Sequence, residues 1–247
     1  MRDRDILKVS VFAICVIMIF TACYKDEVFN SILNPKEFIY LKINPDTIHA
    51  DGYSKAMVEI NIPEATKNNY DTIRLSATNG KFPNGNKSIL VKSYDNRNDS
   101  IDLKIGLTEL ISTQSPGVSL ITAQVGGYIV SDTIFFARAY PEKITTILPS
   151  LTIGYGYSTI KIATKLSRKF GFPSENTTAI IKAEDANGNS MGQFLNKNET
   201  SDLFGNIANE YSLGIDSSCN CDKVFLITTT QTGLNSFITD TVLLIIN

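Results

Sequence analysis

The sequence contains no tryptophan and a single histidine, His49. Triad chemistry needs a nucleophile, a base and an acid that orients the base, and histidine is the usual base. One histidine, without a Gly-x-Ser-x-Gly segment to present a nucleophilic serine, gives such chemistry little support. We therefore predict that His49 is a turn residue beside a strand. We expect no enzymatic activity, no bound metal and no cofactor.

Basic clusters are also lacking. The chain has 23 Lys and Arg residues against 25 Asp and Glu residues, which gives a net charge of -2. Proteins that bind nucleic acid neutralise phosphates with grouped Lys and Arg side chains. This charge pattern excludes nucleic acid as a partner.

No apolar run near the start is long enough for a stable membrane anchor. Residues 9–20 form an apolar stretch of 12 residues, whereas a spanning helix needs about 20. Basic residues precede this stretch, and the strongly polar residues 24–27 follow it. A charged head, a short apolar segment and small residues at its exit predict a secretory signal peptide over residues 1–22.

The segment Thr21-Ala22-Cys23 resembles the lipobox of bacterial lipoproteins, in which the cysteine is acylated and becomes the new N-terminus. Several acyl chains, such as palmitate, hold a protein firmly on a membrane. The next residues, Lys25-Asp26-Glu27, resemble the export signal of surface lipoproteins in Bacteroidetes-type bacteria, although a solvated linker is the alternative. The resemblance implies an outer-membrane protein that is anchored through Cys23 and faces the cell exterior, with residues 23–35 as a flexible tether.

Besides the acylated Cys23, two cysteines remain in the predicted mature chain, Cys219 and Cys221, within "SSCNCDK". An exported protein meets an oxidising environment, in which an even number of cysteines favours a disulfide. Residues two apart in an extended or turning backbone can bring their α-carbons within the roughly 4.4–6.8 Å that a disulfide tolerates. A local disulfide is our prediction. Free thiols, or a metal site that two thiolates alone leave undercoordinated, are the alternatives.

From residue 38 onward, short stretches alternate between apolar and polar residues, and turn residues separate them. Such runs, rich in Ile, Val, Thr, Tyr and Phe, are typical of half-buried strands. Helical periodicity is weak, and residues 107–113 are predicted to be a loop that crosses between sheets. About seven short strands in about a hundred residues predict a β-sandwich. The stretches are "FIYLKIN", "AMVEINI", "TIRLSAT", "SILVKSY", "SIDLKIGL", "VSLITAQV" and "DTIFFARA".

The pattern then repeats. "ADGYSKAMVEI" is echoed by "GYGYSTIKIAT", "NGKFPN" by "MGQFLN", and "SDTIFFA" by "TDTVLLI", at nearly constant offsets of about a hundred residues. The repeat predicts an all-β protein of two tandem sandwich domains over residues 36–140 and 141–247, with the boundary near Pro141.

The stretches "PDTIHADGYSKAMVEINI", "LSATNGKF" and "GVSLITAQVGGYIVSDTIFF" resemble the bacterial immunoglobulin-like domains of the invasin and intimin group. In the second copy, "TSDLFGNIANEYSLGI" resembles the segment of that group with spaced Thr, Asp, Gly, Ala and Tyr residues. The second copy departs by placing Tyr155 where the first has Asp51. The resemblance implies immunoglobulin-like sandwiches used as stalk or display modules on bacterial surfaces.

Two polar patterns invite functional interpretations. Asp185, Asn187 and Asn189 alternate like calcium ligands, but the glycine is misplaced and no Glu closes the loop, so we predict a hairpin turn.

Five triplets of Asp, then Ser or Thr, then an aliphatic residue resemble the O-glycosylation acceptor motif of Bacteroidetes-type bacteria. Strand onset after a turn is the alternative explanation. The acceptor hydroxyls belong to Thr47, Thr72, Ser100, Thr133 and Thr241.

Together these features predict a lipid-anchored surface protein without enzymatic activity that acts in adhesion or protein interaction. Its contacts are expected through loops at the distal end of the second domain or through an exposed sheet edge. One alternative is an accessory subunit of an outer-membrane transport, assembly or secretion complex. Another is a glycan-binding module that uses Tyr53, Tyr155 and Tyr157, against which the absence of tryptophan counts.

Overall fold

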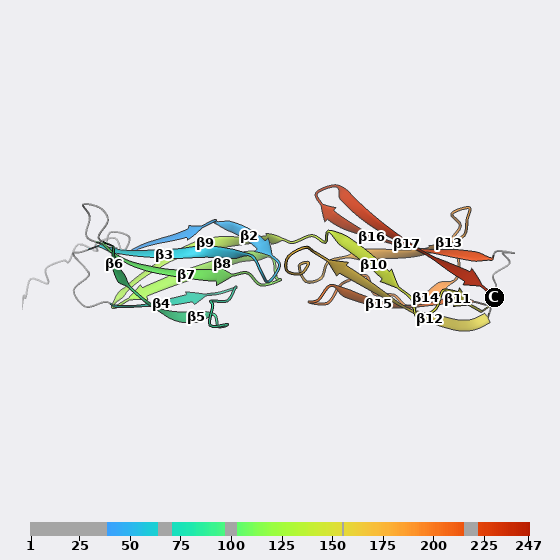
Figure 1. The fold of residues 1–247 in the computed structure, drawn as a ribbon, viewed down its shortest axis with the longest axis horizontal. Coiled ribbons are helices and arrows are strands. Elements are labelled where there is room, and N and C mark those ends of the chain that lie inside the picture. The colour runs from blue at the N-terminus through green and yellow to red at the C-terminus, as the bar shows by residue number, and fades with distance from the viewer. Residues whose placement is uncertain (1–38, 64–70, 97–102, 155, 215–221) are drawn as a thin grey trace, which may run out of the picture. The chain divides into compact units, whose positions relative to one another are not determined.

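The computed structural model describes residues 39–63, 71–96, 103–154, 156–214 and 222–247. All regular elements in these ranges are β-strands, which confirms the predicted all-β class (Figure 1). Within the same ranges, no helix is long and apolar enough to cross a membrane. Several predicted site residues lie outside the described residues: Cys23, Lys25, Asp26, Glu27, Ser100, Cys219 and Cys221.

The first sandwich comprises two sheets with the strand orders β1-β3-β7-β6 and β2-β9-β8-β4-β5. All neighbours are antiparallel except β2 and β9, which are parallel. The strands are β1 (Tyr40–Asn44), β2 (Thr47–Ala50), β3 (Lys55–Pro63), β4 (Thr72–Ala77), β5 (Ser88–Lys92), β6 (Tyr94–Asn96), β7 (Leu103–Ile111), β8 (Gly117–Val125) and β9 (Tyr128–Arg138).

The second sandwich comprises sheets with the strand orders β10-β12-β15-β14 and β11-β17-β16-β13. Its single parallel pair among the described strands is β11 with β17, the counterpart of β2 with β9. The strands are β10 (Lys143–Ile147), β11 (Thr152–Ile153), β12 (Gly156–Ser167), β13 (Ala179–Glu184), β14 (Gln193–Asn196), β15 (Asn206–Gly214), β16 (Lys223–Gly233) and β17 (Ser236–Ile246).

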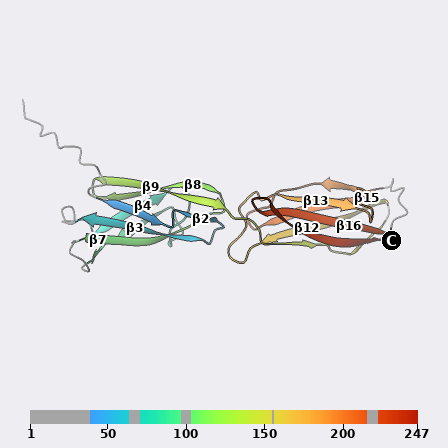
Figure 2. The same ribbon diagram turned by 90° about the horizontal axis from the view of Figure 1, so that it is seen from above.

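Period-two alternation builds the core of the first sandwich. Successive side chains of a strand point to opposite faces of the sheet, so alternate residues are buried. Along β3, Val58 and Ile60 are fully buried, and they belong to one apolar cluster with Ile121 and Ile134 from the facing sheet. Figure 2 separates the two layers, with β8 and β9 on one side and β3 and β7 on the other.

The second sandwich has two apolar clusters within the described residues. The larger includes Ile162, Tyr211 and Leu226, and the smaller includes Ile144 and Leu166. Polar residues that face the interior, among them Thr146, Thr164 and Thr228, are also buried. The same strand plan therefore encloses a more polar interior in the second sandwich than in the first.

Two local predictions were wrong. Residues 107–111 belong to strand β7, not to a crossing loop. His49 lies in the short strand β2 and pairs with Ala137 of β9, so it is not a turn residue. Strand β7 is mostly half-buried and strand β2 has only four residues, so neither shows a clear alternation of apolar and polar residues in the sequence.

The segment after β13 confirms the predicted turn. Asp185 accepts hydrogen bonds through Oδ1 from the backbone N–H groups of Asn187 (2.8 Å) and Asn189 (2.9 Å), and through Oδ2 from Asn189 Nδ2 (2.9 Å). These bonds to Asn189 and Asn187 hold the pKa of Asp185 below its usual value of 3.8, although desolvation opposes them. The carboxylate closes a turn, as expected of an Asx motif.

The described strands all lie in one compact unit, Phe38–Asn247. Strand β9 ends at Arg138 and β10 begins at Lys143. The compact unit is not divided between the two sandwiches, so the domain limits at residues 140 and 141 stay a prediction. The echoed segments "SDTIFFA" and "TDTVLLI" lie in β9 and β17, the last strand of each sandwich.

Candidate functional site at the junction of the sandwiches

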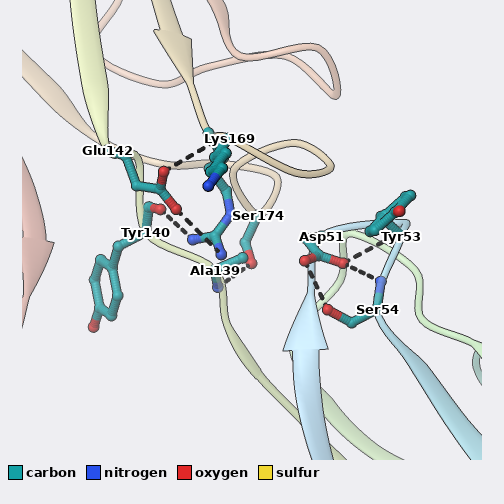
Figure 3. Close-up of polar contacts among 9 residues, drawn as sticks. Asp51, Tyr53, Ser54, Ala139, Tyr140, Glu142, Lys169 and Ser174 are labelled. Carbon is teal, nitrogen blue, oxygen red and sulfur yellow. Dashed lines mark hydrogen bonds and ion pairs between the residues drawn. The ribbon is translucent and has the colours of Figure 1, made fainter.

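We use the term junction for residues 50–54, 112–115, 139–142 and 168–175, which connect the two sandwiches. Ser174 and Ala139, both fully buried, hold its centre. The Ala139 N–H donates to Ser174 Oγ (2.9 Å), and the Ser174 N–H donates to the Ala139 carbonyl (2.9 Å). Ser174 Oγ in turn donates to the Ala50 carbonyl (2.9 Å). Figure 3 shows Ser174 beside Ala139.

A glycine allows the backbones to meet beside this centre. The Phe172 N–H donates to the Asp51 carbonyl (2.9 Å). Gly171 has a φ of 67°, and a Cβ at this position would lie 2.6 Å from the Asp51 carbonyl oxygen. A side chain at Gly171 is therefore excluded both by backbone conformation and by space.

The Asp51 carboxylate organises the turn before β3, as Figure 3 shows. Its Oδ1 accepts hydrogen bonds from the N–H groups of Tyr53 (2.9 Å) and Ser54 (2.7 Å) and from Ser112 Oγ (3.1 Å). Its Oδ2 accepts a bond from Ser54 Oγ (2.8 Å). Burial alone raises the pKa of Asp51, but the combined hydrogen bonds from Ser54, Tyr53 and Ser112 outweigh it and hold the pKa below its usual value.

The short connection between β9 and β10 is held by Arg168. This side chain donates a hydrogen bond to the Tyr140 carbonyl, and its Nη2 lies 3.9 Å from Glu142 Oε1. Glu142 Oε2 accepts a bond from the Lys169 N–H (3.0 Å), which is drawn in Figure 3. The connection is thus fixed by side chains of the second sandwich.

Two pairs of exposed aromatic rings flank the junction. Tyr53 and Phe170 stack with their centroids 5.8 Å apart, and Phe172 meets Phe204 edge-on at 5.8 Å. Between 41% and 58% of each residue is exposed. Exposed apolar groups gathered in one region are typical of protein-interaction surfaces, in which aromatic residues are enriched. We call these four residues the junction aromatics.

A groove of about 590 Å³ opens beside the stacked pair. It is lined by His49 and Asp51 from the first sandwich and by Arg168 and Phe170 from the second, together with neighbouring residues. Within the described residues, no group of three or more His, Cys, Asp or Glu side chains is arranged to hold a metal ion. The groove therefore offers mixed polar and aromatic contacts.

The structure places four of the five predicted acceptor hydroxyls. Thr47, Thr72, Thr133 and Thr241 are all exposed, on β2, β4, β9 and β17 respectively. They lie on separate strands. Thr47 lines the groove beside Tyr53 and Phe170, whereas Thr72, Thr133 and Thr241 are not among its lining residues.

Some aspartates of the same triplets have structural partners. Asp71 Oδ1 forms an ion pair with Lys104 Nζ (2.6 Å). Asp240 Oδ2 accepts a hydrogen bond from the Thr146 N–H (2.6 Å). At these two positions, an ion pair and a hydrogen bond to a backbone N–H group also account for the aspartate.

The sequence analysis missed Phe170, Phe172 and Phe204 as candidate surface residues. The available signal was the segment "KFGFP", in which two aromatic residues flank a glycine between strands. Large apolar residues outside alternating runs have no strand face to occupy, so they are candidates for loop contacts or exposed surface.

No family model matches the sequence, and no curated protein matches it. Solved structures do match. The Yersinia pseudotuberculosis adhesin InvE is 11% identical, with a TM-score of 0.50, over 83% of this chain and 58% of that one. Invasin, described as a bacterial integrin-binding protein, is 16% identical, with a TM-score of 0.56, over 84% of this chain and 39% of that one.

The chain spans less than two thirds of the length of both adhesins. At these identities the likeness shows the fold, which is the tandem immunoglobulin-like sandwich seen in these proteins. The predicted fold class is thereby confirmed.

Proposed function

We propose that this protein is a surface-exposed outer-membrane lipoprotein that acts in adhesion or protein interaction and has no enzymatic activity. The observation that carries the interaction role is the exposure of the junction aromatics, Tyr53, Phe170, Phe172 and Phe204. Rings that are half exposed in water gain free energy when a partner covers them, by about 25 cal/mol for each Å² of apolar surface removed from water.

Two further observations support this proposal. The fold is shared with InvE, an adhesin, and with invasin, which binds integrin. The leader sequence carries the lipobox-like Thr21-Ala22-Cys23 and the charged Lys25-Asp26-Glu27. An anchored stalk with an exposed aromatic surface suits contact with molecules outside the cell.

The interaction role is tested by adhesion of cells that display the full chain. Phe170→Ser together with Phe204→Ser removes one ring from each aromatic pair. We expect adhesion to protein-coated surfaces to fall about tenfold or more, because interface aromatics are often the dominant contacts. Phe237→Ser is the matched control, since Phe237 is a similarly exposed ring (66%) on β17 that belongs to neither aromatic pair. Equal adhesion of both variants and the wild type would remove the role assigned to the junction aromatics.

The anchor is tested separately. Cys23→Ser is expected to leave the protein without a lipid mass and to release it from the membrane fraction. Asp26→Ala with Glu27→Ala is expected to keep the lipid but to lose accessibility to protease on intact cells. Retention of the lipid mass in the Cys23 variant would refute the assignment of Cys23.

We further propose O-glycans on the exposed hydroxyls of Thr47, Thr72, Thr133 and Thr241, and on Ser100. Exposure of the first four makes them accessible to a modifying enzyme. Mass spectrometry of the protein from its native membrane is expected to show hexose-containing peptides at one or more of these positions. A mature mass that is explained by the lipid alone would exclude the modification.

A further inference from the structure

Strand β12 is paired on one side over only part of its length. β10 pairs with residues 163–167 of β12, whereas β15 on the other side pairs with Gly156 and then, after an irregularity, with residues 159–165. Among the described residues, no strand lies beside residues 158–162 on the side away from β15. We call residues 158–162 the β12 edge. Alternate residues of a strand direct their N–H and C=O groups to the same side, so this edge presents unpaired backbone groups.

The first sandwich closes the equivalent position more fully. There β1 pairs with residues 57–61 of β3, so that at the N-terminal end of that strand only Lys55 and Ala56 extend beyond β1. In the second sandwich β10 ends at Ile147, and the chain crosses to the other sheet, where β11 pairs with β17. The early crossing leaves the β12 edge open.

An apolar groove of about 950 Å³ runs along this edge. β10 contributes Ile147, the crossing chain contributes Leu148, and β11 contributes Ile153. The edge contributes Ile160 and Ile162, whose side chains point inward and are buried. A strand placed here would direct alternate side chains into the groove, beside these isoleucines.

The outer face of the edge carries a positive charge. Lys161 is exposed, and it takes part in no ion pair among the described residues. Its neighbour across the ladder, Glu210, accepts a hydrogen bond from Asn196 Nδ2 (3.2 Å). Lys161 therefore lies between Glu210 on one side and the position of an added strand on the other, where an acidic side chain would face it.

The outer strand β13 is less open, although it is also an edge. Isolated bridges join Thr178 to Thr200 and Glu184 to Ser190, so chain segments cover both of its ends. The β12 edge combines three features: unpaired backbone, an adjoining apolar groove and an unpaired lysine.

We propose that the β12 edge binds an extended segment of a partner protein, which adds to the sheet as a further strand. The segment carries apolar residues opposite Ile160 and Ile162 and an Asp or Glu opposite Lys161. This mode of recognition draws affinity from backbone hydrogen bonds and specificity from alternate side chains. The inference deepens the proposed interaction role, on which its biological meaning rests.

The binding test uses the full chain in detergent and a synthetic peptide of eight residues. The peptide alternates valine and threonine, and an aspartate replaces the threonine nearest to its centre. Two N-methylated versions each lack one alternate set of amide donors. We expect methylation of the set that faces the edge to weaken binding by about 30-fold or more, because several backbone hydrogen bonds are lost. The other set should have a much smaller effect. Equal effects of both sets, or no binding of the unmethylated peptide, would overturn the proposal.

A charge exchange locates the site. Lys161→Glu is expected to weaken binding of the aspartate peptide by about fivefold to tenfold and to favour a peptide with lysine at that position. The matched control is Lys182→Glu, an exposed lysine of β13 in the other sheet of the same sandwich. Equal effects of the two variants would place the peptide elsewhere and overturn the proposal.

The adhesion assay keeps the two proposals apart. Register-specific peptide binding by a protein that gives no adhesion would uphold the β12 edge and refute the adhesion role. Adhesion that is unchanged by Lys161→Glu, in a protein that does not bind the peptide, would uphold adhesion and refute the β12 edge.

Discussion

In the first sandwich the buried apolar residues of the described strands form one continuous cluster, whereas those of the second sandwich form two. Hydroxyl groups occupy inward positions between these two clusters. Thr146 Oγ1 donates a hydrogen bond to Thr228 Oγ1 (3.1 Å), and the Thr146 N–H donates one to Asp240 Oδ2. Thr164 Oγ1 is buried and has no hydrogen-bond partner within the described residues. The same fold thus tolerates a polar layer when most of its groups are paired.

The polar layer and the open β12 edge both involve strands β10 and β12 of the second sandwich. β10 carries Thr146 of the polar layer and also ends early, which opens the β12 edge. The first sandwich closes the equivalent position with β1 and has an apolar interior. We infer that the first sandwich is the better-packed module, and that the second has kept a less completely packed flank on which a partner strand can dock.

The largest effect is expected in the continuous core. Phe136→Ala removes a fully buried ring of the first sandwich, and such truncations cost about 3–5 kcal/mol. Urea unfolding of the purified protein measures the loss. Phe237→Ala, an exposed ring of the second sandwich, is the control and should change stability by less than about 0.5 kcal/mol. A cost for Phe136→Ala near that of the control would contradict the continuous core.

The junction is tested at Gly171. Gly171→Ala places a Cβ 2.6 Å from the Asp51 carbonyl, at a φ of 67°. Gly188→Ala is the matched control, since its φ is 83° and a Cβ there meets nothing within 4 Å. Both variants bear the cost of the left-handed backbone, about 1–2 kcal/mol. Only Gly171→Ala should also lose protection of the Phe172 amide in hydrogen exchange. Equal protection in both variants would show that the close approach is not required.

Asp51 gives the first sandwich a dependence on pH. Its pKa is lowered in the folded protein from an ordinary value of 3.8. The stability it contributes is therefore fully present above that value and is lost as the pH falls through the lowered folded pKa. Asp51→Asn is expected to cost about 1–2 kcal/mol near neutral pH. Urea unfolding of both proteins should show this difference shrinking in strong acid. A difference that stays constant with pH would refute the role of the charge.

The smallest effect is expected for a substitution that makes the interior of the second sandwich less polar, like that of the first. Thr164→Val replaces the unpartnered buried hydroxyl with a methyl group of similar size. The substitution should stabilise the second sandwich by about 1 kcal/mol, since burying an unpaired hydroxyl costs about 1–3 kcal/mol. Thr159→Val, an exposed threonine of the same strand, is the control. A loss of stability in Thr164→Val, measured by urea unfolding, would mean that the hydroxyl has a partner.

Much of the fold was predictable because inward and outward residues alternate along strands such as β3 and β8. The first half of strand β7 was predicted within "SIDLKIGL", but residues 107–111 escaped prediction because their burial does not alternate regularly. Strand β2 has only four residues, too few to show a period.

The junction was not predictable from the sequence. Its central bonds join the backbone and hydroxyl of Ser174 to the backbone at Ala139 and Ala50, which are distant in the chain. Hydrogen bonds to backbone groups do not require particular side chains at Ala139 and Ala50, so they leave no pattern in the sequence. The same holds for the β12 edge, which arises because β10 ends early, so an exposed edge could be expected from the sequence but not located.

The measurement that tests the central claim most directly is purification of the tagged full chain from its own outer membrane in mild detergent. Co-purifying membrane proteins are quantified, and surface exposure is recorded beforehand by labelling intact cells. The proposed role predicts a surface-labelled, lipid-bearing protein without a stoichiometric membrane partner. A stoichiometric partner of the membrane, or a protein that is shielded from surface label, would contradict the adhesion role and make this chain a subunit of a membrane complex.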